Sequence, residues 1–65
     1  MKVVKIIKII KTLEKDGWYI ARTKGSHRQF KHPLKKGAVT VNGHPSDDVW
    51  GTLLRSIEAQ SGLVF

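Results

Sequence analysis

Apolar residues at intervals of three and four predict a helix near the start of the chain. They would form a stripe along one side of a helix over about residues 3–15. Lysines recur at similar intervals and fall on the opposite side. Gly17 follows the last periodic residue, in the position where a left-handed residue commonly ends a helix. The apolar stripe comprises Val3, Ile6, Ile7, Ile10 and Leu13, and the basic side comprises Lys5, Lys8, Lys11 and Lys15.

A second helix is predicted over about residues 48–61. Ser46 or Asp47 is suited to cap its N-terminus, and Gly62 is the expected end. Trp18 and Trp50 are both expected to fill the core, because large aromatic side chains dominate the apolar area of a small domain. The apolar side of this helix comprises Val49, Trp50, Leu53, Leu54 and Ile57.

Three short segments between the helices are predicted to be strands, over residues 18–23, 27–32 and 38–41. Turns that contain glycine or proline separate them, and such short connections favour antiparallel pairing. The order α-β-β-β-α therefore predicts an α+β fold. Two helices would cover one face of a three-stranded antiparallel sheet and leave the other face open.

Composition adds a strong positive charge to this outline. Among 65 residues, 12 are Lys or Arg and 5 are Asp or Glu, which gives a formal net charge of +7. We expect a single domain over residues 1–65 with a small core. The charge favours a polyanionic partner, with nucleic acid first and an anionic membrane second, and an acidic protein would fit equally well. The absence of cysteine excludes disulfides and thiolate metal sites.

The sequence does not predict a membrane protein. No run reaches the roughly 20 apolar residues that a membrane-spanning helix needs. The first residues have the basic-then-apolar order of a signal peptide, but Lys5, Lys8 and Lys11 interrupt the apolar run and no small-residue cleavage site follows. We therefore expect a cytoplasmic protein without a membrane partner.

Alternation along the second strand predicts which side chains face the solvent. Phe30 is its best core residue, so Arg28 and His32 should share the covered face. His27, Gln29 and Lys31 should then point to the open face. This places His27 beside the turn at residues 24–26 and among basic side chains.

An exposed histidine in this setting could transfer a proton on RNA. Its ordinary pKa of about 6.5 makes both protonation states available near neutral pH. RNA carries its own nucleophile, the 2′-hydroxyl group, so an enzyme must only remove that proton, stabilise the phosphorane and protonate the leaving oxygen. Nearby lysine and arginine would supply positive charge. Gly25 would let the backbone approach a phosphate, and Ser26 could donate a hydrogen bond to it.

The residues alone leave a non-catalytic role open, since an isolated strand histidine is usually just a surface residue. His32 and His44 each stand next to a proline at an element boundary, and we expect both to be structural. The three histidines lack the spacing of a metal-ligand set, so neither a metal nor another cofactor is expected.

The segment over residues 24–33, Lys-Gly-Ser-His-Arg-Gln-Phe-Lys-His-Pro, resembles the signature of HicA-type toxins, the mRNA interferases of HicAB toxin–antitoxin systems. The resemblance extends from about residue 4 to residue 63. It includes the pairs Gly17-Trp18 and Gly62-Leu63 and the strand Val39-Thr40-Val41. It implies a double-stranded-RNA-binding-domain-like α-β-β-β-α fold. It also implies metal-independent cleavage of mRNA by the histidine of Gly-Ser-His, here His27, and a HicB-type antitoxin that covers the site.

One departure concerns the last helix. The family's helix commonly opens with Pro-Gly-Thr-Leu, whereas here Trp50 precedes Gly51-Thr52-Leu53. Either the helix begins earlier, near the acidic pair at residues 47–48, or the local alignment shifts by one residue.

The leading hypothesis is therefore a toxin endoribonuclease with His27 as general base, or as acid in a companion step. The expected RNA-binding residues are Lys24, Gly25, Ser26, Arg28 and Lys31. Two alternatives remain at this point: an RNA-binding module without catalysis, and a protein-interaction domain that binds an acidic partner.

Overall fold

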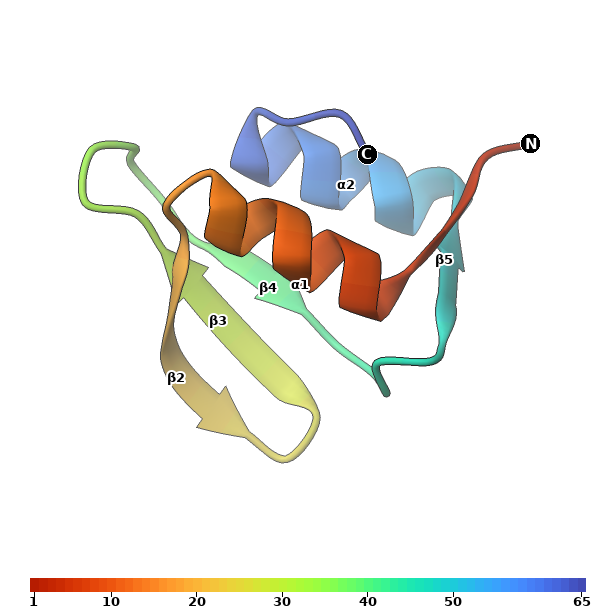
Figure 1. The fold of residues 1–65 in the computed structure, drawn as a ribbon, viewed down its shortest axis with the longest axis horizontal. Helices are drawn as coiled ribbons and strands as arrows, with labels where there is room; N and C mark the ends of the chain where they lie inside the picture. Colours follow the sequence, from red (N-terminus) through yellow and green to blue (C-terminus); the bar gives the residue numbers. More distant parts are fainter.

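The computed structural model describes all 65 residues and contains five strands and two helices. Three strands form an antiparallel sheet in the order β2-β3-β4, and the other two, β1 and β5, pair antiparallel in a separate ribbon. Figure 1 shows the elements in chain order. They are β1 (Val3–Lys5), α1 (Ile6–Lys15), β2 (Tyr19–Lys24), β3 (His27–Lys31), β4 (Val39–Val41), β5 (Asp48–Trp50) and α2 (Gly51–Ser61).

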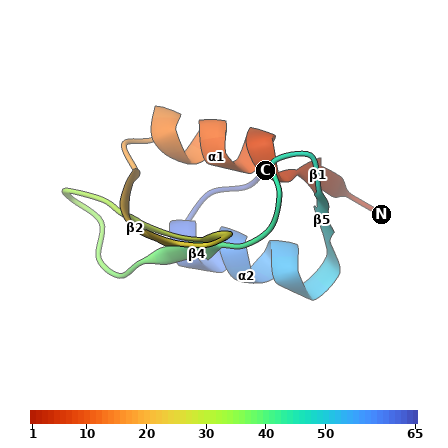
Figure 2. The same cartoon turned by 90° about the horizontal axis from the view of Figure 1, so that it is seen from below.

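The predicted α+β fold, which is like that of double-stranded-RNA-binding domains, is confirmed. Figure 2 shows the sheet nearly edge-on, with α1 over one of its faces. Helix α2 lies along β4, where the side-chain oxygen of Gln60 accepts a hydrogen bond of 3.1 Å from the backbone N–H of Thr40. The face of β2 and β3 turned away from α1 stays exposed and is the open face expected from the sequence.

The core lies between the two helices and the covered face of the sheet. Phe30 on β3 pairs with Val39 on β4, so the two side chains share one face, and both are fully buried. Trp18 is 2% exposed and confirms its predicted place in the core. The other buried apolar residues are Val4, Ile6, Ile9, Leu13, Val41, Val49, Leu54 and Ile57.

The predicted start of the first helix is wrong by three residues. The segment Val3–Lys5 is the strand β1, and the helix begins at Ile6. Pairing with β5 favours the strand because it places Val4 opposite Val49, both buried, and Lys5 opposite Asp48, with which it forms an ion pair of 2.8 Å. β-branched valine suits this extended conformation.

The apolar stripe of α1 also differs from the one predicted. Ile9, which the prediction omitted, is fully buried with Ile6 and Leu13, whereas Ile7 is 39% exposed and Ile10 is half-buried. The side of the helix that faces the core is therefore defined by Ile6, Ile9 and Leu13.

The second helix starts at Gly51 rather than near Asp48, and neither predicted cap caps it. Its N-cap residue is Trp50, with no side-chain cap. Asp47 instead accepts a hydrogen bond of 2.9 Å from the backbone N–H of His44 and closes the preceding turn. The start at Gly51 agrees with the Gly-Thr-Leu opening of the family. Gly62 ends the helix at φ 73°, as predicted.

Trp50 and Leu53 were expected in the core, but they are 53% and 55% exposed. For Trp50 the error follows from the assignment of residues 48–50 to a helix. In the strand β5 the side chains alternate, so Val49 points inward while Trp50 points outward.

A hydrogen-bonded cluster joins the end of α1 to the segment after β3. The Nδ1 atom of His32 accepts hydrogen bonds from the backbone N–H groups of Leu34 and Lys35, at 3.0 and 3.1 Å. Its Nε2 atom therefore carries the hydrogen and donates it to the carbonyl of Asp16 at 2.7 Å. The ring of Trp18 packs edge-on against His32, with centroids 5.2 Å apart. His32 thus has the structural role expected from the sequence.

Gly17 is required by this cluster for two reasons. It has φ +104°, which disfavours other residues, and a Cβ atom there would lie 2.8 Å from Nε2 of His32. Gly17→Ala should therefore displace His32 and cost about 1–3 kcal/mol of unfolding free energy beyond the backbone strain. Gly37→Ala is the matched control, because Gly37 has φ +82° with open space around it. Urea unfolding should show the larger loss for Gly17→Ala, and equal losses would contradict this reading.

The same cluster makes stability depend on acid pH. The pKa of Asp16 lies below its ordinary value of 3.8, chiefly because Lys35 donates a hydrogen bond to the carboxylate, with a further one from Trp18. A carboxyl group whose pKa is lowered on folding adds stability that is present above its unfolded pKa and is lost as pH falls through the folded value.

Asp16→Asn should therefore be less stable than the wild type at pH ~5, and this difference should shrink as the pH falls to ~2. Urea unfolding of both proteins across this range measures the effect. A difference that stays constant with pH would show that the ion pair adds no stability.

Candidate functional site

The hairpin of β2 and β3 brings together the residues that the sequence singled out. Gly25 and Ser26 form its turn, and the strands begin to pair at Lys24 and His27. Gly25 has φ +58° and Ser26 has no positive φ, which is the pattern of a type II′ turn with glycine at its first central position. Because Lys24 and His27 are directly paired, their side chains lie on the same face of the sheet.

That face is the open one. Gln29 lies two residues from His27 and therefore points to the same side, opposite to the buried Phe30. Gln29 also pairs with Arg22 on β2 and with Thr40 on β4, so all three strands contribute to this surface. The orientation predicted for His27 and Gln29 by alternation is confirmed.

A shallow hollow of about 230 Å³ lies on this surface. It unites Lys24, His27 and Arg28, three of the predicted site residues. Its lining has no apolar side chain and no carboxylate. The lining residues are Arg22, Lys24, His27, Arg28, Gln29 and Thr40.

Two lining residues, Arg22 and Thr40, were missed by the sequence reasoning. A register irregularity between Ile20 and Arg22 interrupts strict alternation along β2, so no simple count could have assigned Arg22 to the open face. Thr40 could have been found, because it is the polar residue between two buried valines in the Val-Thr-Val strand.

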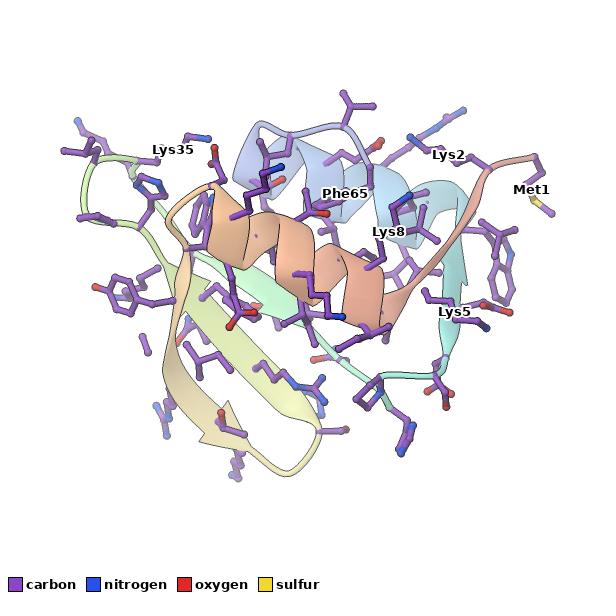
Figure 3. The ribbon with its side chains drawn as sticks, in the orientation of Figure 1. Met1, Lys2, Lys5, Lys8, Lys35 and Phe65 are labelled. Carbon is purple, nitrogen blue, oxygen red and sulfur yellow. The ribbon has the colours of Figure 1, made fainter.

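The hollow is electropositive. Its three cations, Arg22 and Lys24 on β2 and Arg28 on β3, form no ion pair. The three ion pairs of the chain join Lys2 to Glu58, Lys5 to Asp48 and Lys35 to Asp16, all outside the hollow. Figure 3 labels these three lysines. The positive charge beside His27 is therefore free to act on an anionic ligand.

Arg28 differs from the other cations of the site. It pairs with Val41 on the covered side of β3, and its Nη1 atom donates a hydrogen bond of 2.9 Å to the carbonyl of Gly43. The same atom lies 3.5 Å from the carbonyl of Ser26 in the turn. Arg28 thus ties the end of the hairpin to the loop after β4, and only part of its guanidinium group remains available at the rim of the hollow.

The other predicted RNA-binding residues lie around the hollow rather than in it. Gly25 and Ser26 are exposed at the tip of the hairpin, and a Cβ atom on Gly25 would meet no neighbour. Lys31 is exposed at the far end of β3, where it pairs with Tyr19, and it does not line the hollow. A ligand that reached Lys31 would have to extend along the strand.

The exposed imidazole of His27 makes no hydrogen bond within the chain, so both ring nitrogens can reach a ligand. It stands beside unpaired cations on the hairpin of β2 and β3. This arrangement can hold a phosphate group and exchange a proton with it. No group of three or more His, Cys, Asp or Glu side chains is arranged to hold a metal ion. None of the helices has the length and apolar character needed to cross a membrane.

Comparison with known proteins identifies the family. No curated protein matches the chain. The family model described as "HicA toxin of bacterial toxin-antitoxin" matches residues 7–63. The match covers β2, β3, β4, α2 and all of α1 except Ile6, and so includes the whole hollow. The chain therefore belongs to the HicA family of toxins from bacterial toxin–antitoxin systems.

Proposed function

We propose that this protein is a toxin endoribonuclease that cleaves mRNA in the cytoplasm without a metal, with His27 as its catalytic residue. The observation that carries the proposal is the position of His27, exposed in a hollow with unpaired cations and no carboxylate. Membership of the HicA toxin family supports an RNA substrate, since the motif around His27 in this chain resembles the signature of HicA-type mRNA interferases. The whole chain acts as a single ribonuclease domain.

The reaction uses the nucleophile of the RNA itself. Neutral His27 removes the proton of a 2′-hydroxyl group, and that oxygen attacks the adjacent phosphorus. The bond from phosphorus to the 5′-oxygen of the next nucleotide then breaks, which leaves a 2′,3′-cyclic phosphate. The departing oxygen takes a proton from solvent water in the open hollow, and His27 returns its proton to solvent. General base catalysis of this kind contributes about 10²–10⁴-fold to a rate.

The cations stabilise the pentavalent phosphorane as negative charge accumulates on it. Lys24 is the nearest one to His27 in the pairing scheme and has no other partner. Arg22 adds a second charge from the same strand. Arg28 assists from the rim while its bond to Gly43 fixes the end of the hairpin. Gly25 and Ser26 shape the turn, and Lys31 holds the strand of RNA further along the face.

A HicB-type antitoxin is the proposed partner of this surface. The hollow is shallow and basic, so an acidic segment of a protein laid across β2 and β3 would cover His27 and neutralise the cations. Binding would also stabilise the small core of the toxin by mass action, since only the folded state offers this surface.

Replacing His27 should abolish cleavage. His27→Gln should lower the rate of RNA cleavage by about 10²–10⁴-fold in the presence of a chelator, because the general base is lost. His44→Gln is the matched control: His44 is also exposed, but its Nδ1 atom contacts Ser46 and it lies outside the hollow. Gel analysis of a labelled RNA measures both.

Equal cleavage by the wild type and His27→Gln would contradict the assignment of His27 as the catalytic residue. RNA that is bound by the wild type but never cleaved would favour the alternative of a non-catalytic RNA-binding module. Growth gives a second readout of the same variant: expression of the wild type alone should arrest cells, and His27→Gln should be tolerated at the same soluble level.

The turn should matter to activity apart from stability. Gly25→Ala and Gly37→Ala each force a side chain into a positive φ with open space around it, so each should cost about 1–2 kcal/mol of stability. Only Gly25 adjoins the pair of Lys24 and His27. Cleavage at a temperature where both variants are folded should therefore fall for Gly25→Ala and persist for Gly37→Ala. Equal activities would show that the turn does not position the site.

A further inference from the structure

The outer face of α1 carries a second basic surface that the proposed reaction does not use. Lys8, Lys11 and Lys15 lie on the side of the helix opposite to the buried Ile9 and Leu13, and all three are exposed. With Ile7 and Thr12 they line a shallow hollow of about 370 Å³. At a rise of about 1.5 Å per residue, the three lysines follow one another along the axis at steps of about 4.5 and 6 Å.

These lysines are not neutralised by the protein. Three of the five acidic residues pair with other lysines, namely Asp16 with Lys35, Asp48 with Lys5 and Glu58 with Lys2. Asp47 closes the turn at His44. Glu14 is the one carboxylate on α1 and forms no ion pair, so the surface as a whole keeps a net positive charge.

This surface and the His27 hollow lie on opposite sides of the molecule. Figure 2 shows α1 over one face of the sheet. Residues that line the hollow, such as Gln29, point to the other face, opposite to the buried Phe30. The shortest extent of the Cα trace is 18 Å, so a single phosphodiester cannot touch both surfaces. A longer strand could occupy the hollow and then pass around the sheet to α1.

We propose that the outer face of α1 is a second RNA-contact surface, in which Lys8, Lys11 and Lys15 bind phosphates of the RNA away from the cleaved bond. The proposal takes RNA as the ligand from the proposed function. Lysine is a mobile point charge that binds phosphate without reading sequence, so these contacts add affinity to any RNA long enough to reach them.

The composition of the surface favours RNA over a protein partner. The cores of protein interfaces are depleted in lysine and enriched in aromatic residues and arginine. Here three lysines surround a single apolar side chain, Ile7, which is 39% exposed. Such a surface offers little apolar area to bury. Its lysines can instead displace counterions from the phosphates of a nucleic acid, and this release of counterions drives nucleic-acid binding.

The test is the salt dependence of binding to a 2′-O-methyl RNA of about 15 nucleotides, which cannot be cleaved because its nucleophile is blocked. Each phosphate contact on a single strand contributes about 0.7 to the slope of log K against log salt. Lys8→Gln/Lys15→Gln should therefore reduce the slope by about 1.4 and weaken binding about tenfold at ~0.15 M salt. The double variant Lys36→Gln/Arg55→Gln removes the same charge from exposed positions elsewhere and should keep most of the slope.

Cleavage of a dinucleotide, which has only one phosphodiester, should be the same for the wild type and Lys8→Gln/Lys15→Gln. An unchanged salt slope in that variant, or an equal loss in both double variants, would overturn the proposal. A variant that keeps the slope but no longer binds the antitoxin would also overturn it and assign the surface to an acidic protein. If the wild type cleaves no RNA, the proposed function is wrong. The slopes of log K against log salt would still show whether the lysines of α1 bind RNA.

Discussion

The burial of Phe30 on the central strand is the constraint on which the rest of the structure depends. β3 pairs on both sides, with β2 and β4, so its side chains must divide between a covered and an open face. Burying one phenylalanine contributes about 1.5–3 kcal/mol, and a one-residue slip would expose it. The same register therefore fixes His27 and Gln29 on the open face. Core packing thus determines where the candidate chemistry lies.

The fold also determines how charge is distributed over the surface of the molecule. The molecule carries 12 basic and 5 acidic residues, and three of the acidic ones form ion pairs that hold elements together. Asp48 bridges the ribbon, Glu58 binds the start of the chain, and Asp16 joins the cluster around His32. With four of its five carboxylates used for structure, the protein presents unpaired cations on two outward surfaces. The composition gives only the total net charge, whereas the fold determines where on the surface the positive charge lies.

Much of this could be predicted from the sequence, and the limits have physical causes. The three meander strands were predictable because turn residues separate them and because one strand contains an unmistakable core aromatic. The position of His27 followed from Phe30 by alternation. The ends of the helices were not predictable, because residues 3–5 and 48–50 become strands only by pairing with each other across the chain. The periodicity of a local segment does not reveal a pairing partner far away in the sequence. Val3 and Trp50 were therefore both assigned to the apolar sides of helices. Arg22 escaped detection because of an irregularity in pairing.

The ribbon of β1 and β5 has a consequence for how the protein acquires its fold. It joins segments some 45 residues apart, and Lys2 and the backbone N–H of Phe65 both bind Glu58 near it. Contacts between residues so far apart in the sequence form late in folding, because the entropic cost of closing a large loop must be met first. During synthesis, β1 has no partner until β5 has emerged from the ribosome, although the hairpin that carries His27 is already complete. The nascent chain therefore passes through a stage at which the hairpin can form but the segment that begins the fold is still free.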